Sequence, residues 1–424
     1  METVQGGVTA PIGFAAAGVF CGIKKRAKDL ALIISNRPAA VAGTLTVNRM
    51  RAPCVEWAEK ILRNGWARAI VANSGNANCC TGRRGVRDNR AMAEETARLF
   101  GIPSEQVLVA STGVIGQPLP MEKVRKGIRS ARAGLKRTGS HSAAEAILTT
   151  DLRPKEFAVR WKTAGRVVTV GGIAKGSGMI APHMAPPPVS GPKGRSSKAA
   201  GGGRTGGGVA TMLAFLTTDL TVKPALLREA LRQTVPHTFN AITVDGEMST
   251  NDMVLLMANG GAGLPPLKKN SPAYRDFLRA VRQVCETLAK EIVRDGEGVT
   301  RLFTVKVTGA ASPSEAAQVA RRIANSLLVK TMVAGRDPNW GRIAAAAGAC
   351  GIPFKSNRLM IRLGKLTVFK GGEPASVSRA AMLEQVDQPE IVMEVDLGRG
   401  LAQAQILSGD LTEEYVKINA KYTS

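Results

Sequence analysis

Residues 210–219 have the sequence ATMLAFLTTD and follow a glycine-rich stretch, GGIAKGSGMIAP, at residues 171–182. Threonine is common in strands, so the plainest interpretation of Thr211 is a strand residue. The second interpretation is chemical. If the peptide bond before Thr211 is cut, the freed α-amine can act as the base for the hydroxyl of the same residue, because an α-amine titrates near neutral pH. The small side chain of Ala210 leaves room for that hydroxyl to attack the peptide carbonyl.

The sequence on either side of this segment alternates short apolar strands with amphipathic helices. Strands are predicted at residues 30–34, 69–72, 167–170, 302–307 and 391–397. One helix is predicted to begin at Ser271-Pro272. A second is predicted after SPSE at residues 312–315, which has the form of a capping box with proline at the first helical position. Strands and helices mixed in this way predict a layered α/β architecture.

The charge of the chain is its unusual bulk property. The 424 residues carry 58 Lys and Arg against 33 Asp and Glu, a formal net charge of +25. Such a balance suits acidic partners, so a basic nucleic-acid-binding protein is a rival, non-enzymatic interpretation. Aromatic residues make up only 4% of the chain, which offers few platforms for stacking bases. The basic segment 123–137 also has an apolar stripe (Val124, Ile128, Leu135), which favours a solvated surface helix over a nucleic-acid site.

The cysteines and histidines give no metal or disulfide signature. The six cysteines are scattered without a CxxC pair, and the three histidines lack metal-ligand spacing. Buried free thiols in a reducing compartment are the expected state of the cysteines. The first twenty residues lack a basic start followed by an apolar run, and no run of 18 apolar residues predicts a membrane span. We therefore expect a cytoplasmic protein.

Several glycine-rich turns are weak signals singly, but their order along the chain is specific. The sequence closely resembles the ornithine acetyltransferase family, whose members are also called bifunctional glutamate N-acetyltransferases. The resemblance covers essentially the whole chain except residues 186–209. It rests on residues 171–182 and 210–219 and on GVTAP (7–11), NSGNAN (73–78), ASTGVIG (110–116), DGEMSTND (245–252), DPNWGR (337–342) and YVKINAKYTS (415–424).

The resemblance implies a layered αββα sandwich like that of other self-cleaving N-terminal-nucleophile enzymes, with a smaller C-terminal α/β part. It implies self-cleavage between Ala210 and Thr211, giving an alpha chain of residues 1–210 and a beta chain of residues 211–424 that assemble as a heterotetramer. In relatives the glycine-rich stretch runs through Ala-Pro directly into Ala-Thr. Here the Pro-, Gly- and Ser-rich insertion 186–209 intervenes, so we expect cleavage to be slower.

The resemblance also implies the roles of individual residues. Thr211 would be the nucleophile, and the Thr112 hydroxyl with the Gly113 backbone N–H would form the oxyanion hole, which needs donors aimed at the developing charge. Substrate contacts carry over to Thr149, Lys175, Thr211, Glu297, Asn419 and Ser424. Ornithine and glutamate are zwitterions, so a lysine and a glutamate in one site suit both of their charges.

The implied reaction is a ping-pong transfer of acetyl from N-acetylornithine to glutamate, with no metal or organic cofactor. Acetyl-CoA is a further candidate donor of the acetyl group. The rival enzymatic interpretation is a related N-terminal-nucleophile aminopeptidase or amidase, which would release acetate to water. An unprocessed relative retained for binding is the non-enzymatic alternative.

Overall fold

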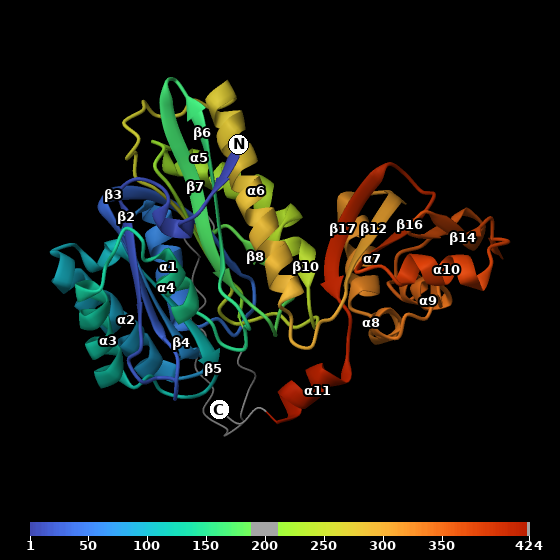
Figure 1. Ribbon diagram of the computed structural model, residues 1–424, viewed down its shortest axis with the longest axis horizontal. Helices are drawn as coiled ribbons and strands as arrows, with labels where there is room; N and C mark the ends of the chain where they lie inside the picture. Colours follow the sequence, from blue (N-terminus) through green and yellow to red (C-terminus); the bar gives the residue numbers. More distant parts are fainter. Residues whose placement is uncertain (188–210, 422–424) are drawn as a thin grey trace. The chain divides into compact units, whose positions relative to one another are not determined.

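The computed structural model describes residues 1–187 and 211–421, which form a mixed α/β fold with two sheets, as the sequence predicts. The chain divides into two compact units (Figure 1). Unit 1 comprises Met1–Asn240 and Met248–Ile292, and unit 2 comprises Ala241–Glu247 and Val293–Ser424. The predicted cut after residue 210 therefore falls inside unit 1 and not between the units.

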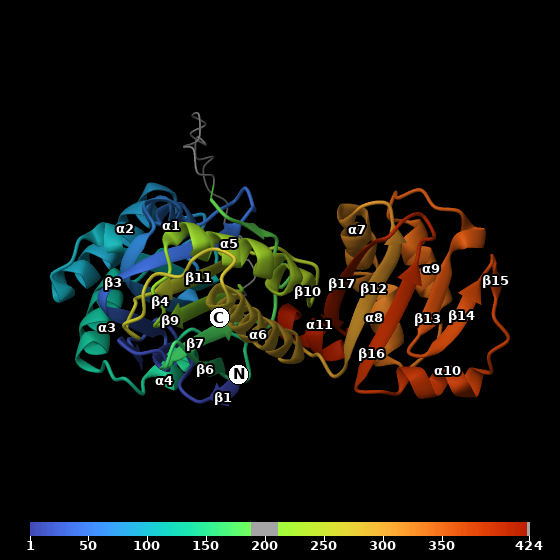
Figure 2. The ribbon, with the colours of Figure 1, turned by 90° about the horizontal axis from the view of Figure 1, so that it is seen from above.

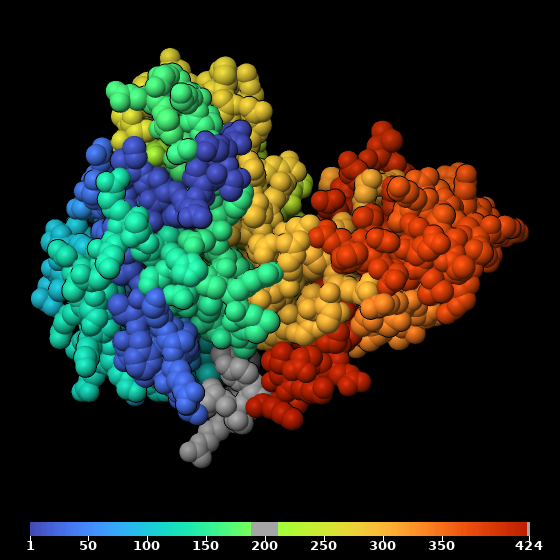
Figure 3. Space-filling view, in the orientation of Figure 1, coloured from blue at the N-terminus to red at the C-terminus, as the bar shows by residue number. Residues whose placement is uncertain are grey.

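The described part of unit 1 contains one ten-stranded sheet. Its strands are β1 (Glu2–Val4), β2 (Phe14–Val19), β3 (Leu30–Thr46), β4 (Trp66–Asn76), β5 (Val107–Val114), β6 (Lys155–Thr163), β7 (Arg166–Lys175), β8 (Met184–Ala185), β9 (Leu213–Thr218) and β11 (Met253–Ala258). The main path runs β1-β6-β7-β9-β11-β3-β4-β5, and β2 and β8 pair with β3. On the surface in Figure 3, the blue N-terminal residues lie against the green β6–β7 hairpin, as the antiparallel β1–β6 pair requires.

Strand β9, which follows Thr211, is in the middle of this sheet. It pairs antiparallel with β7 and parallel with β11, and β11 continues antiparallel to β3. Every residue of β9 and β11 is buried, which explains their nearly unbroken apolar sequences. The segments before and after the predicted cut thus share one hydrogen-bonded ladder.

The long strand β3 connects the two halves of the sheet. Its register with β4 shifts between Ile34 and Ala39, where the intervening residues 36–38 are exposed. The part before this irregularity pairs with β2, and the part after it pairs with β11. A bulge of this kind bends the strand and increases the local twist, so one strand serves both halves.

Helices cover the sheet of unit 1 (Figure 2). They are α1 (Pro53–Asn64), α2 (Gly82–Phe100), α3 (Met121–Ala133), α4 (Ser140–Ala146), α5 (Pro224–Thr234) and α6 (Pro272–Arg294). Buried side chains of α1 to α4 join those of β2 to β5 in one core. Helix α6 packs closely on β7: a Cβ added at Gly172 of β7 would lie only 3.1 Å from Cδ1 of Leu288 of α6.

Unit 2 is a smaller α/β unit with its own core. Seven described strands form its sheet in the order β10 (Ile242–Thr243), β17 (Ala402–Gly409), β12 (Leu302–Ala310), β16 (Glu390–Asp396), β13 (Met360–Leu363), β14 (Leu366–Lys370) and β15 (Glu373–Pro374). Its helices are α7 (Pro313–Ala324), α8 (Leu327–Ala334), α9 (Gly341–Gly348), α10 (Arg379–Val386) and α11 (Glu413–Ala420).

The elements predicted from the sequence are confirmed. The N-cap of α7 is formed by Ser312, whose hydroxyl accepts the backbone N–H of Glu315 at 3.2 Å. Helix α3 buries Val124 and Ile128, as the apolar stripe predicts, but it ends at Ala133, before Leu135. Within residues 1–187 and 211–421, the helices lack the combination of length and apolar character needed to cross a membrane.

Candidate active site

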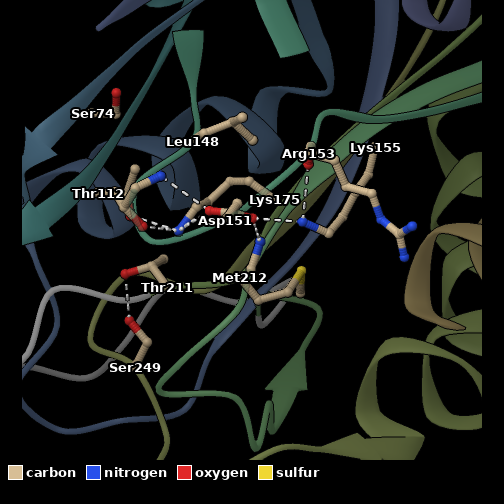
Figure 4. Close-up of polar contacts among 12 residues, drawn as sticks. Ser74, Thr112, Leu148, Asp151, Arg153, Lys155, Lys175, Thr211, Met212 and Ser249 are labelled. Atoms are coloured by element: carbon tan, nitrogen blue, oxygen red, sulfur yellow. Dashed lines mark hydrogen bonds and ion pairs between the residues drawn. The ribbon is translucent and has the colours of Figure 1, made fainter. Parts of the chain in front are cut away.

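Thr211 is the first described residue after the insertion, and it lies two positions before β9. Its side chain is 2% exposed. Its Oγ1 atom is 2.8 Å from Oγ of Ser249 (Figure 4). The next residue, Met212, donates its backbone N–H to Oδ1 of Asp252 at 2.8 Å. The candidate nucleophile is therefore held on both its side-chain and its main-chain side by residues 249–252.

The predicted oxyanion donors Thr112 and Gly113 lie on β5. They pair in parallel register with Ser74 and Gly75 of β4. Gly113 has a φ of 132°, and a Cβ built there would lie 2.2 Å from the carbonyl carbon of Gly75. Only glycine can adopt this conformation at such a close approach of two backbones. The close approach of the two backbones therefore explains why position 113 is a glycine.

Lys175 ends β7 and is fully buried. Its Nζ atom is 2.7 Å from Oγ1 of Thr149 and 3.4 Å from Oγ1 of Thr112, to both of which it donates (Figure 4). Because an ammonium has donors only, each of these hydroxyl oxygens must accept. Lys175 therefore joins a predicted oxyanion residue to a predicted substrate residue, and it leaves the Thr112 proton available to point elsewhere.

Asp151 is the carboxylate that pairs with Lys175. Its Oδ1 atom accepts Nζ of Lys155 at 2.8 Å, and its Oδ2 atom lies 3.5 Å from Nζ of Lys175. Burial alone would raise the pKa of Asp151, but the charges of Lys175 and Lys155 and the hydrogen bond from Lys155 outweigh it and hold that pKa well below its usual range. Two ammonium groups share one carboxylate, so the cluster carries a net positive charge that suits an anionic ligand or intermediate.

Residues 249–252 connect the nucleophile to the oxyanion strand. The side-chain amide of Asn251 donates to the carbonyl of Ser111 at 2.8 Å and to the carbonyl of Ala77 at 2.8 Å. Ser111 directly precedes Thr112, and Asp252 holds the backbone next to Thr211. Residues 249–252 thus fix the position of the candidate nucleophile and that of the strand with the predicted oxyanion donors.

Glu297 and Asn419 lie in unit 2 and contact each other. The Asn419 amide donates to Oε2 of Glu297 at 2.8 Å, and Glu297 is 6% exposed. Helix α11, which carries Asn419, is fixed to the 295–298 turn because the hydroxyl of Thr412 donates to the carbonyl of Gly298 at 2.7 Å. Gly298 has a φ of 70°, and a Cβ there would be 2.6 Å from the backbone nitrogen of Tyr415.

The structure therefore groups the predicted residues by unit. Lys175 links Thr112 and Thr149 in unit 1, where Thr211 and Gly113 also lie, whereas Glu297 and Asn419 form a pair in unit 2. Ala210 and Ser424 lie outside the described residues. The sequence alone assigned no role to Ser249, Asn251 and Asp252, although the segment 245–252 is one of those that carry the family resemblance. It also assigned no role to Asp151, which follows Thr149 and Thr150.

Among residues 1–187 and 211–421, no group of three or more His, Cys, Asp or Glu side chains is placed to hold a metal ion. The buried charges around Lys175 are paired by hydrogen bonds and by Asp151.

The family model and the curated relatives that match this chain all bear the same family name. The family model described as "ArgJ family" matches residues 15–424. The arginine biosynthesis bifunctional protein ArgJ of Symbiobacterium thermophilum is 47% identical over 425 residues, covering 100% of both chains. That of Synechococcus is 43% identical over 434 residues, covering 100% of this chain and 99% of the relative. A crystal structure of ornithine acetyltransferase from Mycobacterium tuberculosis, complexed with ornithine, is 41% identical and covers 43% of this chain and 99% of that chain, with a TM-score of 0.41.

The full-length relatives and the family model define the class of protein. It is an acetyltransferase of arginine biosynthesis. Within that class, the chain belongs to the ArgJ family.

Proposed function

We propose that this protein transfers an acetyl group from N-acetylornithine to glutamate through an acetyl ester on Thr211. The observation that carries the proposal is the placement of Thr211. Thr211 is buried two residues before the central strand β9, and its hydroxyl is in hydrogen-bond contact with that of Ser249. Strand β7, which pairs with β9, ends at Lys175, whose ammonium donates to the hydroxyl of Thr112. A threonine hydroxyl is a weak nucleophile unless a base and an electrostatic environment activate it.

The first step of the proposal is self-cleavage. The Thr211 hydroxyl attacks the carbonyl of Ala210, the amide nitrogen leaves as the free α-amine of Thr211, and water hydrolyses the ester that results. The products are residues 1–210 and 211–424. The sheet explains how both could remain together, because β9 of the second fragment lies next to β7 of the first, and β11 lies next to β3.

The second step is acetyl transfer. The Thr211 hydroxyl attacks the acetyl carbonyl of N-acetylornithine, its proton passes to the α-amine and then to the departing amine of ornithine, and an acetyl-threonine ester forms. The amine of glutamate attacks this ester, and N-acetylglutamate leaves with the Thr211 hydroxyl restored. The hydroxyl of Thr112 and the N–H of Gly113 stabilise the oxyanion of each tetrahedral intermediate.

Substrate recognition in the proposal uses the charged residues already described. The substrate-binding residues of the proposal are Thr149, Lys175, Thr211, Glu297, Asn419 and Ser424; the ammonium of Lys175 suits a carboxylate, and the carboxylate of Glu297 suits an ammonium group. The same proposal includes assembly as a heterotetramer of two alpha and two beta chains and a cytoplasmic location. It also includes the use of acetyl-CoA as a second acetyl donor.

Intact-protein mass spectrometry tests the proposal. Purified protein should show two fragments, the second beginning at Thr211, and incubation with N-acetylornithine should add ~42 Da to that fragment, as expected for a covalent acetyl intermediate. Glutamate should remove the adduct and yield N-acetylglutamate. Release of acetate to water, with no transfer to glutamate, would instead indicate an N-terminal-nucleophile amidase and contradict the proposal.

A further inference from the structure

Ser249 is the side chain in hydrogen-bond contact with the candidate nucleophile. Its Oγ atom is 2.8 Å from Oγ1 of Thr211, and both residues are buried (Figure 4). We propose that the Ser249 hydroxyl donates a hydrogen bond to Oγ1 of Thr211 and so stabilises the negative charge that develops on this oxygen. The inference rests on the proposed function of Thr211 as the acetyl-carrying nucleophile.

The direction of this hydrogen bond follows from the chemistry of the base. For the α-amine of Thr211 to remove the hydroxyl proton, that proton must point at the amine of the same residue. The Thr211 hydroxyl has a single proton, so it cannot donate to Ser249 at the same time. The contact at 2.8 Å is therefore satisfied in the reactive state when Ser249 donates and Thr211 accepts.

The surroundings of Ser249 hold its oxygen in place. The backbone N–H of Asn251 donates to Oγ of Ser249 at 3.2 Å, and the hydroxyl of Thr46 donates to the backbone carbonyl of Ser249 at 2.9 Å. The bond from Asn251 occupies one acceptor site of the Ser249 oxygen and makes its proton a better donor, because hydrogen bonds in a chain polarise one another. The donor is thus oriented before the reaction begins, which is the condition for electrostatic catalysis.

This position predicts a specific kinetic signature. The proposed hydrogen bond from Ser249 strengthens when negative charge develops on Oγ1 of Thr211, in the transition state and not in the substrate complex. Its removal should therefore lower kcat and leave KM nearly unchanged. Because the α-amine remains the base, the pKa that governs the acidic limb of the kcat/KM profile should also stay where it is in the wild type.

The test uses Ser249→Ala with Ser35→Ala as the matched control. Ser35 is another fully buried serine, and its hydroxyl donates to the backbone carbonyl of Arg37, so the control removes the same kind of group from elsewhere in the sheet. Acetyl transfer from N-acetylornithine to glutamate is measured for each protein, with kcat expressed per cleaved chain from the mass spectrum. For Ser249→Ala we expect kcat to fall about 10- to 100-fold, the usual effect of losing a hydrogen bond to a charged group. Self-cleavage should slow as well.

The outcomes separate this inference from the function on which it rests. A Ser249→Ala enzyme with kcat within twofold of the wild type would overturn the inference while leaving the acetyl-threonine mechanism intact. Loss or displacement of the acidic limb would also overturn it, because Ser249 would then act in place of the amine. Absence of transfer by the wild type and by Ser35→Ala would refute the proposed function itself. Ser249→Cys, a weaker donor of similar size, should give an intermediate kcat and guards against a folding defect in the alanine variant.

Discussion

Gly113 and Gly75 face each other across the parallel pair of β5 and β4, and their backbones approach so closely that a Cβ on Gly113 would lie 2.2 Å from the carbonyl carbon of Gly75. The two glycines belong to separate segments of the sequence, GNAN (75–78) and STGV (111–114). Their contact places the backbone of the predicted oxyanion donor against the loop that Asn251 holds through the carbonyl of Ala77.

Replacing Gly113 with alanine should abolish acetyl transfer and destabilise the fold. The added methyl group meets backbone atoms that cannot move aside, and the φ of 132° is strained for any L side chain. We expect a loss of about 1–3 kcal/mol in the free energy of unfolding from the backbone strain. Gly116→Ala is the matched control, because its φ is 86° but its Cβ would meet nothing within 4 Å. Urea unfolding and a transfer assay compare the two variants, and equal effects on activity would contradict the steric argument.

Replacing Thr211 with alanine should leave the chain uncut and without transferase activity, because both steps use the same hydroxyl. Thr217→Val is the control from β9, the strand that follows Thr211; the Thr217 hydroxyl donates to the carbonyl of Val8 at 2.8 Å. Gel electrophoresis and mass spectrometry should show one uncut chain without an acetyl adduct for Thr211→Ala, and two fragments with an adduct for Thr217→Val. Transfer at the wild-type rate by Thr211→Ala would refute the proposed mechanism.

Replacing Asp151 with asparagine should destabilise the protein at neutral pH. The change leaves the buried ammonium groups of Lys155 and Lys175 without their shared carboxylate, and breaking a buried ion pair in this way costs about 3–5 kcal/mol. The pKa of Asp151 is lower in the folded chain than in the unfolded chain. Its contribution to stability is therefore fully present above the unfolded pKa of about 4 and is lost as the pH falls below it.

Chemical denaturation between pH 3 and pH 7 measures this dependence. The wild type should lose stability as the medium becomes acidic, and part of that loss should be missing in Asp151→Asn. Asp88→Asn offers a comparison on the surface helix α2, where burial raises the pKa of the carboxyl despite nearby arginines. Identical acid sensitivity of the wild type and Asp151→Asn would show that Asp151 does not contribute in the way described.

The stability of unit 2 should depend on pH through Lys330. This side chain is buried, donates to Oγ of Ser408 at 3.1 Å and lies over the ring of Phe303. Burial lowers the pKa of Lys330 to about 8, although the negative charges of Asp245 and Asp410 act to raise it. The folded pKa is below the unfolded value of about 10.4, so the folded state disfavours the charged form. Stability should therefore rise as the pH increases from about 8 toward 10.4 and should be flat in Lys330→Met. Thermal melting across this range measures the effect, and a rise that persists in Lys330→Met would assign it to another group.

Local sequence patterns determined much of this structure. Apolar runs predicted the buried strands around residues 30–34 and 69–72, and the Ser312 cap predicted the start of α7, because periodicity and capping depend on neighbours in the chain. The resemblance also selected Lys175 and Thr112, which the structure brings into hydrogen-bond contact, and Glu297 and Asn419, which it pairs in unit 2.

The tertiary structure alone decided which side chains support those residues. Ser249 is 38 positions from Thr211, Asn251 is 140 positions from Ser111, and the carboxylate of Asp151 lies between two lysines of different strands. Contacts over such distances arise from strand order and register, and these depend on the packing of the whole sheet. A sequence motif identifies the group that reacts, but the hydrogen bonds that orient it exist only once separate strands have been assembled side by side.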